Sequence, residues 1–498
     1  MKRYGWFSVG LQALMLLVIV GAIYEFQMFR LYAWEANHLF QLDWGYCIDT
    51  LSHTGGGAML VASLLTQFFR FLWIGVLCVL AIYVLIFLLT SNIFKKCSVS
   101  SAFSGWLWIP IGFLFLCIEN DYYRFQGHVA FLMSVVGLLG YLSIRKNGLM
   151  YKSVVGVFLT ALLYHLIGPA VWIMVVGAFL LGWKTDKKEV LAGVSCVLAL
   201  VVMGLVSVEL RRVGSMEKAF LPALYYDYPA TYFFPCYAWL SYLLIILAGT
   251  CLSKWVNASI FRVKTLFLVG GIFALLCTLY IYRIVHSPLG YKILKEQYYA
   301  EHGCWEDIVQ MSDSMTRNHF ICYLHLALAQ QGKLPDSLPH YRVFDESQLS
   351  TPSHVKKVRH SLLAHVYYHW RDVEAASDEA LVANHATPGE CNPEQLKILI
   401  QALLVQGKFE MAERFIGQLE KTLFYRSWAK AYRPLLYRPD AVKHDSLLGE
   451  MGRSIPQNRG NQYRDVLKQR MKDMLDACPS NPILEQFFVA YMMLGHGG

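Results

Sequence analysis

The sequence predicts an all-α protein with a polytopic helical membrane domain over residues 1–285 and a soluble helical domain over residues 286–498. Three observations lead to this class. The chain is 56% hydrophobic and only 16% charged at 498 residues, which is too apolar for a soluble protein of this length. Its long apolar runs stop near Val285. The net charge of +9 also lies before that point, since the remainder holds 24 basic and 24 acidic side chains.

The apolar runs predict about nine membrane spans. A spanning helix needs about 20 mostly apolar residues, and runs that approach this length cover residues 6–24, 71–90, 105–118, 128–144, 153–183, 191–208, 232–252 and 265–285. The run 153–183 is too long for one helix and has His165, Gly168 and Pro169 at its middle. We expect two short helices that meet near Gly168, with His165 capping the break. A re-entrant hairpin is the alternative.

Charged residues orient the membrane domain. Thirteen of the twenty basic residues in 1–285 fall in segments that nine crossings place in the cytoplasm, as the positive-inside rule requires. This topology puts the N-terminus inside, and it puts the loops 25–70, 119–127 and 209–231 outside together with residues 286–498.

Acidic residues show the opposite bias, which the positive-inside rule does not explain. Nine of the eleven acidic residues in 1–285 lie in predicted outer loops, namely Glu25, Glu35, Asp43, Asp49, Glu119, Asp121, Glu209, Glu217 and Asp227. Either they simply tolerate wet loops, or some of them form a site on the outer face.

The soluble domain has a weak internal period. Turn residues at Gly303, Gly332, Arg371 and Gly407 each follow an apolar helical stretch, at spacings of 29, 39 and 36 residues, close to the 34 of tetratricopeptide repeats. We expect each turn to end one helix and the next helix to begin two places on, at the buried residues Trp305, Leu334, Val373 and Phe409. Such arrays commonly bind peptides or proteins on a concave face. An irregular helical bundle is the alternative.

Five segments resemble an uncharacterised family of polytopic membrane proteins from Bacteroides-type bacteria. They lie at residues 35–40 (EANHLF), 55–57 (GGG), 65–69 (LTQFF), 121–123 (DYY) and 421–429 (KTLFYRSWA). The resemblance runs over nearly the whole chain. It implies a multi-pass protein of the bacterial inner membrane with a C-terminal tetratricopeptide-like region, which the topology above places in the periplasm, and it implies no function.

A broader resemblance is to glycosyltransferases of the GT-C fold. These begin inside, carry an acidic residue in a long first outer loop and have a DxD-like pair in the second outer loop, between spans three and four. Here the first loop holds Glu35 and Asp43, and the second reads Glu119-Asn120-Asp121. The chain departs from the pattern in having ExD instead of DxD, and Glu35 where Asp is usual.

The resemblance suggests roles for these residues in sugar transfer from a lipid-linked donor. Asp121, Glu119, Glu35 and Asp43 are candidate catalytic carboxylates, because a carboxylate can act as general base or hold a divalent metal. Basic side chains can bind the donor phosphate, and the outer loops offer Arg124, Arg211 and Arg212. The tyrosines at 225, 226 and 228 could stack on a sugar or form a packed loop.

Two function classes follow. The first is a GT-C-like glycosyltransferase that uses a lipid-linked sugar at the outer face. The second is a non-enzymatic scaffold or assembly protein of the envelope that recruits a protein partner through its tetratricopeptide-like domain. Membrane lipid is an expected partner in both, and nucleic acid in neither.

Overall fold

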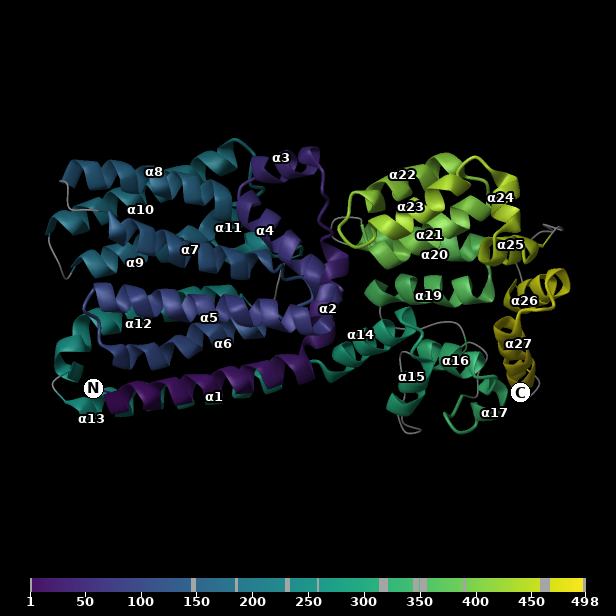
Figure 1. Ribbon diagram of the computed structural model, residues 1–498, viewed down its shortest axis with the longest axis horizontal. Coiled ribbons are helices and arrows are strands. Elements are labelled where there is room, and N and C mark those ends of the chain that lie inside the picture. The colour runs from purple at the N-terminus through teal and green to yellow at the C-terminus, as the bar shows by residue number, and fades with distance from the viewer. Residues whose placement is uncertain are drawn as a thin grey trace. The chain divides into compact units, whose positions relative to one another are not determined.

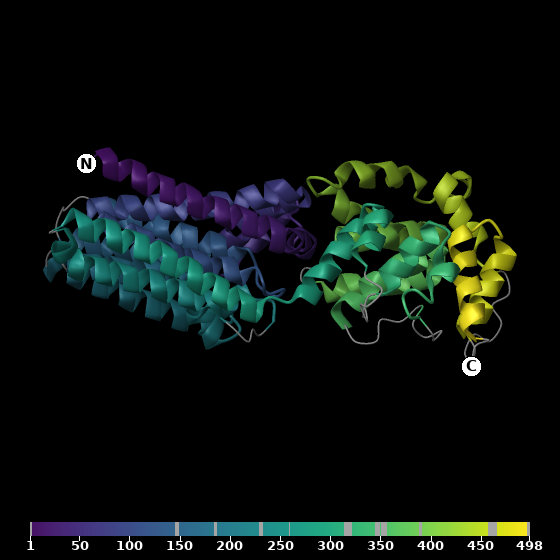
Figure 2. The same ribbon diagram turned by 90° about the horizontal axis from the view of Figure 1, so that it is seen from below.

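The chain divides into two compact units in the computed structural model (Figures 1 and 2), which describes residues 2–144, 149–183, 187–228, 233–257, 259–312, 321–343, 349, 356–387, 391–456 and 466–495. The first unit holds Met1–Glu35 and Asp43–Pro288, and the second holds Ala36–Leu42 and Leu289–Gly498. The regular elements in the described ranges are helices, which confirms the predicted all-α class.

In the first unit, long apolar helices alternate with short connecting helices. In chain order they are α1 (Lys2–Phe26), α2 (Met28–Asn37, whose end lies in the second unit), α3 (Trp44–Ser52), α4 (Gly56–Thr66), η1 (Gln67–Arg70), α5 (Leu72–Lys96), η2 (Ser101–Leu107), α6 (Trp108–Cys117), α7 (Gln126–Ser143), α8 (Leu149–Ile167), η3 (Gly168–Val171), α9 (Trp172–Trp183), α10 (Lys187–Glu209), α11 (Met216–Phe220), η4 (Pro222–Tyr225), α12 (Phe234–Asn257) and α13 (Ile260–Val285).

Six helices in the described ranges are long and apolar enough to cross a membrane, or seven if the bent pair α1 and α2 is counted as one span. They are Leu72–Lys96, Gln126–Ser143, Met150–Trp183 (counted as one although it comprises α8, η3 and α9), Val190–Glu209, Phe234–Asn257 and Phe261–Val285. Only 22% of the apolar window in Phe261–Val285 is buried within the protein. Apolar helices that leave so much surface uncovered fit a lipid environment, so the chain has the character of a multi-pass membrane protein.

The apolar stretch Met150–Trp183 is interrupted, as predicted, at Gly168. Helix α8 ends at Ile167, Gly168 takes a positive φ of 73°, and a short 3₁₀ turn leads into α9. Both α8 and α9 pack against α10, as Figure 1 shows. Positive φ is strained for any residue with a Cβ, so the glycine allows the chain to change direction here.

A tyrosine hydroxyl closes this break. The Oη of Tyr225 donates to the carbonyl of Ile167 at 2.6 Å and accepts from the N–H of Ala170 at 3.0 Å. The carbonyl of His165 accepts the N–H of Gly55, and the capping role of its side chain stays a prediction. The cap comes from a residue distant in sequence, which local patterns could not indicate.

Helices of the second unit are shorter. They are α14 (Pro288–Glu301, which begins at the last residue of the first unit), α15 (Trp305–Met311), α16 (Ile321–Gln330), α17 (Leu334–Ser337), α19 (Lys356–Trp370), α20 (Val373–Ala386), α21 (Pro393–Val405), α22 (Phe409–Glu420), α23 (Arg426–Tyr432), η5 (Arg433–Leu435), α24 (Pro439–His444), α25 (Ser446–Arg453), α26 (Val466–Ala477) and α27 (Pro482–Gly495).

The four predicted turns are confirmed. Their turn residues share a left-handed backbone, with φ of 69° at Gly303 and Gly332, 63° at Arg371 and 72° at Gly407. The next helix begins two residues later in each case, at Trp305, Leu334, Val373 and Phe409. Leu334 and Val373 are buried, whereas Trp305 and Phe409 are only partly buried.

Regular stacking is seen from α19 to α23, where each helix packs against the next. The earlier part is less regular, because α17 has only four residues. The C-terminal helix α27 packs against α16, α17 and α19. The spacing of the turns therefore predicted where helices begin, but not how long each one is.

The second unit also incorporates a segment of the first predicted outer loop. Leu39 is 5% exposed and lies in the same hydrophobic cluster as Tyr425 and Ala429. The N–H of Leu42 donates to the carbonyl of Lys421 at 2.5 Å. The core of this unit is thus completed by residues that precede it by several hundred positions, which the sequence did not indicate.

The carboxyl group of Glu296 is buried in the core of the second unit. Glu296 on α14 is 2% exposed, and its Oε1 lies 3.8 Å from Nζ of Lys292. Burial raises the pKa of Glu296 from 4.5 to about 7, while the nearby Lys292 acts in the opposite direction. Because the pKa of Glu296 is higher in the folded state than in the unfolded state, ionisation of this carboxyl destabilises the folded protein. The stabilisation from the protonated form is complete below pH 4.5 and is lost as the pH rises through about 7.

We expect the variant Glu296→Gln to be more stable than the native protein at pH 8 and equally stable at pH 4.5. The gain at pH 8 is on the order of 3 kcal/mol, because the variant no longer ionises in the core. Urea unfolding of the full-length protein in detergent, followed by circular dichroism, measures it. Glu306→Gln, at an exposed position, is the control and should change neither midpoint. An equal effect of Glu296→Gln at both pH values would contradict the assignment.

Candidate functional site

A bend between α1 and α2 places two polar side chains inside the first unit. The two helices meet at 67°, with Gln27 between them and Arg30 in the first turn of α2. Both residues are buried, at 0% and 4% exposure. The bend therefore directs an amide and a guanidinium away from solvent, where each needs a polar partner.

The partners come from the segment after α6. Successive backbone N–H groups of Ile118, Glu119 and Asn120 donate to carbonyls three residues earlier, so the chain leaves α6 through overlapping turns. The side chain of Glu119 is 2% exposed, whereas that of Asp121 is 57% exposed. The two carboxylates of the ExD motif thus have different environments, one enclosed and one open.

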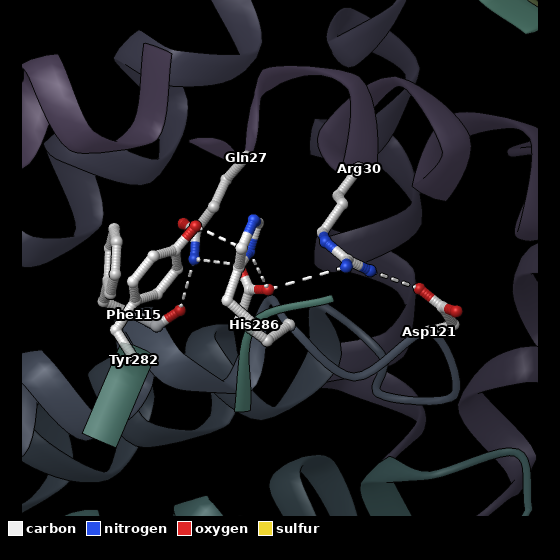
Figure 3. A network of polar contacts seen from close by, with 7 residues as sticks. Gln27, Arg30, Phe115, Asp121, Tyr282 and His286 are labelled. Atoms are coloured by element: carbon white, nitrogen blue, oxygen red, sulfur yellow. Dashed lines mark hydrogen bonds and ion pairs between the residues drawn. The ribbon is translucent and has the colours of Figure 1, made fainter. Parts of the chain in front are cut away.

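Arg30 contacts both carboxylates (Figure 3). Its Nη1 lies 2.6 Å from Oδ1 of Asp121, and its Nη2 lies 3.5 Å from Oε2 of Glu119. Gln27 approaches from the bend and donates through Nε2 to Oε1 of Glu119 and to the carbonyl of Phe115, both at 3.1 Å. The pairing of Glu119 with Asp121, predicted from the motif, is therefore made through a cation that the motif does not contain.

The end of α13 supplies the remaining contact to Glu119. Nδ1 of His286 lies 2.9 Å from Oε2 of Glu119 and 2.6 Å from Oη of Tyr282. The rings of Tyr282 and His286 stack at 4.6 Å, and Figure 3 shows Tyr282 at the opposite end of the cluster from Arg30 and Asp121. If Nδ1 carries a proton it donates to Glu119, and if it does not it accepts from the tyrosine hydroxyl.

Formal charges in this cluster nearly cancel. Glu119 and Asp121 carry two negative charges, Arg30 carries one positive charge, and His286 adds a second when it is protonated. Desolvation makes a buried ion pair costly unless its hydrogen bonds are satisfied. Glu119 meets that condition with side chains from the α1–α2 bend and from the residue after α13, and Asp121 stays exposed.

Sequence reasoning missed Arg30, although a signal was present. It is a basic residue in a predicted outer loop, against the charge bias that places most basic residues inside. A charged residue buried in a membrane domain pairs with another charged group or with backbone carbonyls, so an arginine next to an apolar run indicates such a partner.

Arg124, a candidate phosphate-binding residue, pairs with a carboxylate of the protein. Its Nε lies 2.5 Å from Oδ1 of Asp227, while Asp121 pairs with Arg30. The backbone holds this arrangement, because Tyr123 and Tyr226 form an antiparallel bridge. The segment between α6 and α7 is not helical, so Asp121 and Arg124 lie in separate turns.

The other predicted site residues lie as follows. Arg211 and Arg212 are exposed just beyond the end of α10, with Arg211 at a positive φ of 54°. Glu35 is buried in α2 at 1% exposure, and Asp43 is partly exposed directly before α3. The contacts described above join Glu119 and Asp121 to Arg30; the membership of Glu35 and Asp43 in this site stays a prediction.

Two of the three tyrosines at 225, 226 and 228 are packed inside the protein, which favours the packed-loop interpretation over stacking on a sugar. Tyr225 and Tyr226 are buried, at 0% and 4% exposure, and burial raises the pKa of Tyr226 well above its ordinary value. Only Tyr228 presents an exposed ring, at 53%. Within the described ranges, no group of three or more His, Cys, Asp or Glu side chains could hold a metal ion.

Comparison with known proteins adds a family but no activity. A model of a protein family of unknown function matches residues 2–496. No curated protein matches the chain, and no solved structure matches it. The geometry must therefore support any statement about function.

We expect Arg30→Gln to lower the stability of the protein by about 3–5 kcal/mol, because it leaves Glu119 buried without its cation. The double variant Arg30→Gln with Glu119→Gln should recover most of this loss. Thermal unfolding of the full-length protein in detergent measures both. Arg212→Gln, at an exposed position, is the matched control. Native-like stability of Arg30→Gln would show that the pair does not support the fold.

Proposed function

The chain belongs to DUF6057, a family of unknown function matched over residues 2–496, and we propose that it is a GT-C-like glycosyltransferase that uses a lipid-linked sugar. One observation carries this proposal. Asp121 presents a half-exposed carboxylate that the buried guanidinium of Arg30 holds at 2.6 Å. This carboxylate lies in the loop where the GT-C arrangement has its acidic pair.

The proposed reaction uses Asp121 as general base. The hydroxyl of an acceptor attacks the anomeric carbon of the donor sugar, Asp121 takes the hydroxyl proton, and the bond from that carbon to the lipid phosphate breaks. The phosphate leaves with the electron pair. A general base must come within hydrogen-bond reach of its proton, and an exposed carboxylate can do so.

Arg30 and Glu119 have supporting roles in this proposal. A guanidinium stabilises the negative charge that develops on the departing phosphate. Glu119 positions Arg30 from the buried side and is itself fixed by Gln27 and His286. Arg124 is less suited to bind phosphate than the sequence suggested, since Asp227 already occupies its Nε.

We further propose nine crossings in the inner membrane of a bacterium, with the N-terminus in the cytoplasm and the second unit in the periplasm. The bias of basic residues supports this orientation. The break at Gly168 supports two crossings in residues 153–183, because α8 and α9 both pack against the same helix α10.

Alkaline phosphatase fusions test this topology. Activity is expected for a fusion after Leu289 and not for one at Lys96, because the enzyme is active only outside the cytoplasm. A β-galactosidase fusion at each site is the control and should give the reverse pattern. Activity of the Lys96 phosphatase fusion, or none after Leu289, would contradict the model of nine crossings.

The alternative function is a scaffold, and one feature of the second unit favours it. An open groove of about 870 Å³ lies among α21, α22, α24 and α25. Its walls combine apolar and basic side chains, including Leu404, Phe409, Val442, Lys443, Leu448 and Arg453. Together with the four repeated turns, this groove supports a tetratricopeptide-like domain that holds a segment of a partner protein.

The two functions differ in what Asp121→Asn should do. If Asp121 is the base, this variant should lower sugar transfer by about 100-fold or more, while protein level and membrane insertion stay normal. Transfer in membrane vesicles with a lipid-linked sugar donor is the measurement. Glu217→Gln, in another predicted outer loop and exposed, is the control. The scaffold predicts that Asp121→Asn is silent and that disruption of the groove in the second unit abolishes function.

A further inference from the structure

The first unit carries further charges at the end opposite the cluster around Glu119. Figure 1 shows this end where the N-terminus is marked and where α12 turns into α13. Its basic side chains include Lys95, Lys96, Lys254, Arg262 and Lys264. The two segments that carry these five cations, residues 90–108 and 249–268, contain no Asp or Glu.

A hydrogen bond joins the two segments. The N–H of Ser100 donates to Oγ of Ser253 at 2.9 Å. Lys254 follows Ser253 directly, and Lys95 and Lys96 form the last turn of α5, shortly before Ser100. The lysines of α5 and those of the α12–α13 region therefore lie on adjoining parts of the bundle.

The turn between α12 and α13 holds one of the cations in a defined position. Nη1 of Arg262 donates to the carbonyl of Trp255 at 3.1 Å, and its guanidinium carbon lies 4.6 Å from the centroid of that indole ring. The face of an aromatic ring attracts a guanidinium. Arginine has five N–H donors, and the side chain of Arg262 is exposed, so donors remain for an anion.

These cations lack the partners that the arginines at the other end have. Arg30 pairs with Glu119 and Asp121, and Arg124 pairs with Asp227. Within the described ranges, no acidic side chain forms an ion pair with any of the five. Their counter-charge must therefore come from outside the protein, and at a membrane boundary anionic lipid headgroups supply it.

Exposed apolar side chains lie beside the cations. Leu252 and Trp255 are three residues apart on α12, so they share one face of the helix, and both are exposed. Phe261, directly before Arg262, is 76% exposed. Tryptophan is favoured at the boundary between hydrocarbon and headgroups. This end of the bundle thus offers contacts for acyl chains as well as for a phosphate.

We propose that the turn between α12 and α13 binds an anionic phospholipid, with the phosphate on Arg262, Lys254 and Lys264 and the acyl chains against the exposed apolar side chains beside them. This inference goes beyond the proposed function and does not depend on it. The proposed topology places this end at the cytoplasmic leaflet, whose anionic lipids attract basic segments. The apolar neighbours favour a lipid over a free phosphate.

Native mass spectrometry of the full-length protein in detergent tests this proposal, with phosphatidylglycerol and phosphatidylcholine of the same acyl chains as probes. Phosphatidylglycerol should bind at least about tenfold more tightly, because the two lipids differ in net charge. Glycerol phosphate should compete only weakly, since it lacks the chains. Equal affinity for the two lipids, or equal competition by glycerol phosphate, would overturn the proposal.

Two pairs of substitutions locate the site. Arg262→Gln with Lys264→Gln should weaken phosphatidylglycerol at least about tenfold, which corresponds to somewhat less than ~1 kcal/mol for each charge, and should leave phosphatidylcholine unchanged. Arg211→Gln with Arg212→Gln removes the same charge from exposed positions beyond the end of α10 and should have no effect. Equal weakening by both pairs would show that net charge, and not this turn, determines the affinity.

The indole has its own test. Trp255→Leu removes the ring on which Arg262 lies and should weaken phosphatidylglycerol by several-fold, whereas Trp255→Phe keeps a ring and should weaken it less. Loss of the same size in both variants would contradict a role of the ring in holding the guanidinium. These binding measurements involve no sugar transfer, so their outcome and that of Asp121→Asn are independent of each other.

Discussion

The contact of Arg30 with Glu119, buried at the bend between α1 and α2, is the constraint on which the charged end of the first unit depends. A guanidinium and a carboxylate in this position would each be costly to bury alone. Together they fix three pieces of chain that are distant in sequence, since Arg30 lies on the bend, Glu119 in the turn after α6, and His286 just beyond α13. Removing any one partner leaves the others with charge or hydrogen bonds unsatisfied.

The same constraint separates an enclosed carboxylate from an exposed one. Glu119 is enclosed and accepts contacts from Gln27, Arg30 and His286, so its geometry is determined by its neighbours. Asp121 has one described ion-pair partner and faces solvent. Hydrogen bonds in a low-dielectric site reinforce one another, which makes Arg30 a rigid support for the exposed carboxylate.

Local patterns predicted the parts of this fold that depend on neighbours in sequence. The four turns at Gly303, Gly332, Arg371 and Gly407 fall where predicted, because a left-handed residue and a following helix start are encoded within a few positions. The break at Gly168 was predictable for the same reason. In the site, the ExD motif indicated two carboxylates that Arg30 contacts, and their roles stay a prediction.

Partners that come from far along the chain could not be predicted. Arg30 and Asp121 are separated by 91 positions, and Arg124 and Asp227 by 103. Charge bias indicated which side of the membrane such residues favour, but it contains no information about which acid meets which base. His286 was overlooked because it follows the last apolar run, where sequence alone suggested only a boundary between domains.

The insertion of Ala36–Leu42 into the second unit has a consequence for how the protein is made. Leu39 is synthesised among the first tenth of the chain, yet the cluster that buries it contains Tyr425 and Ala429. During translation this apolar segment must wait until most of the chain has emerged before its partners exist. The entropic cost of closing a loop grows only slowly with the length of the loop. Contacts between residues so far apart in the sequence nevertheless form late, and they lower the folding rate. The second unit therefore completes its core only after synthesis of nearly the entire protein, and until then its early segment is a target for chaperones and proteases.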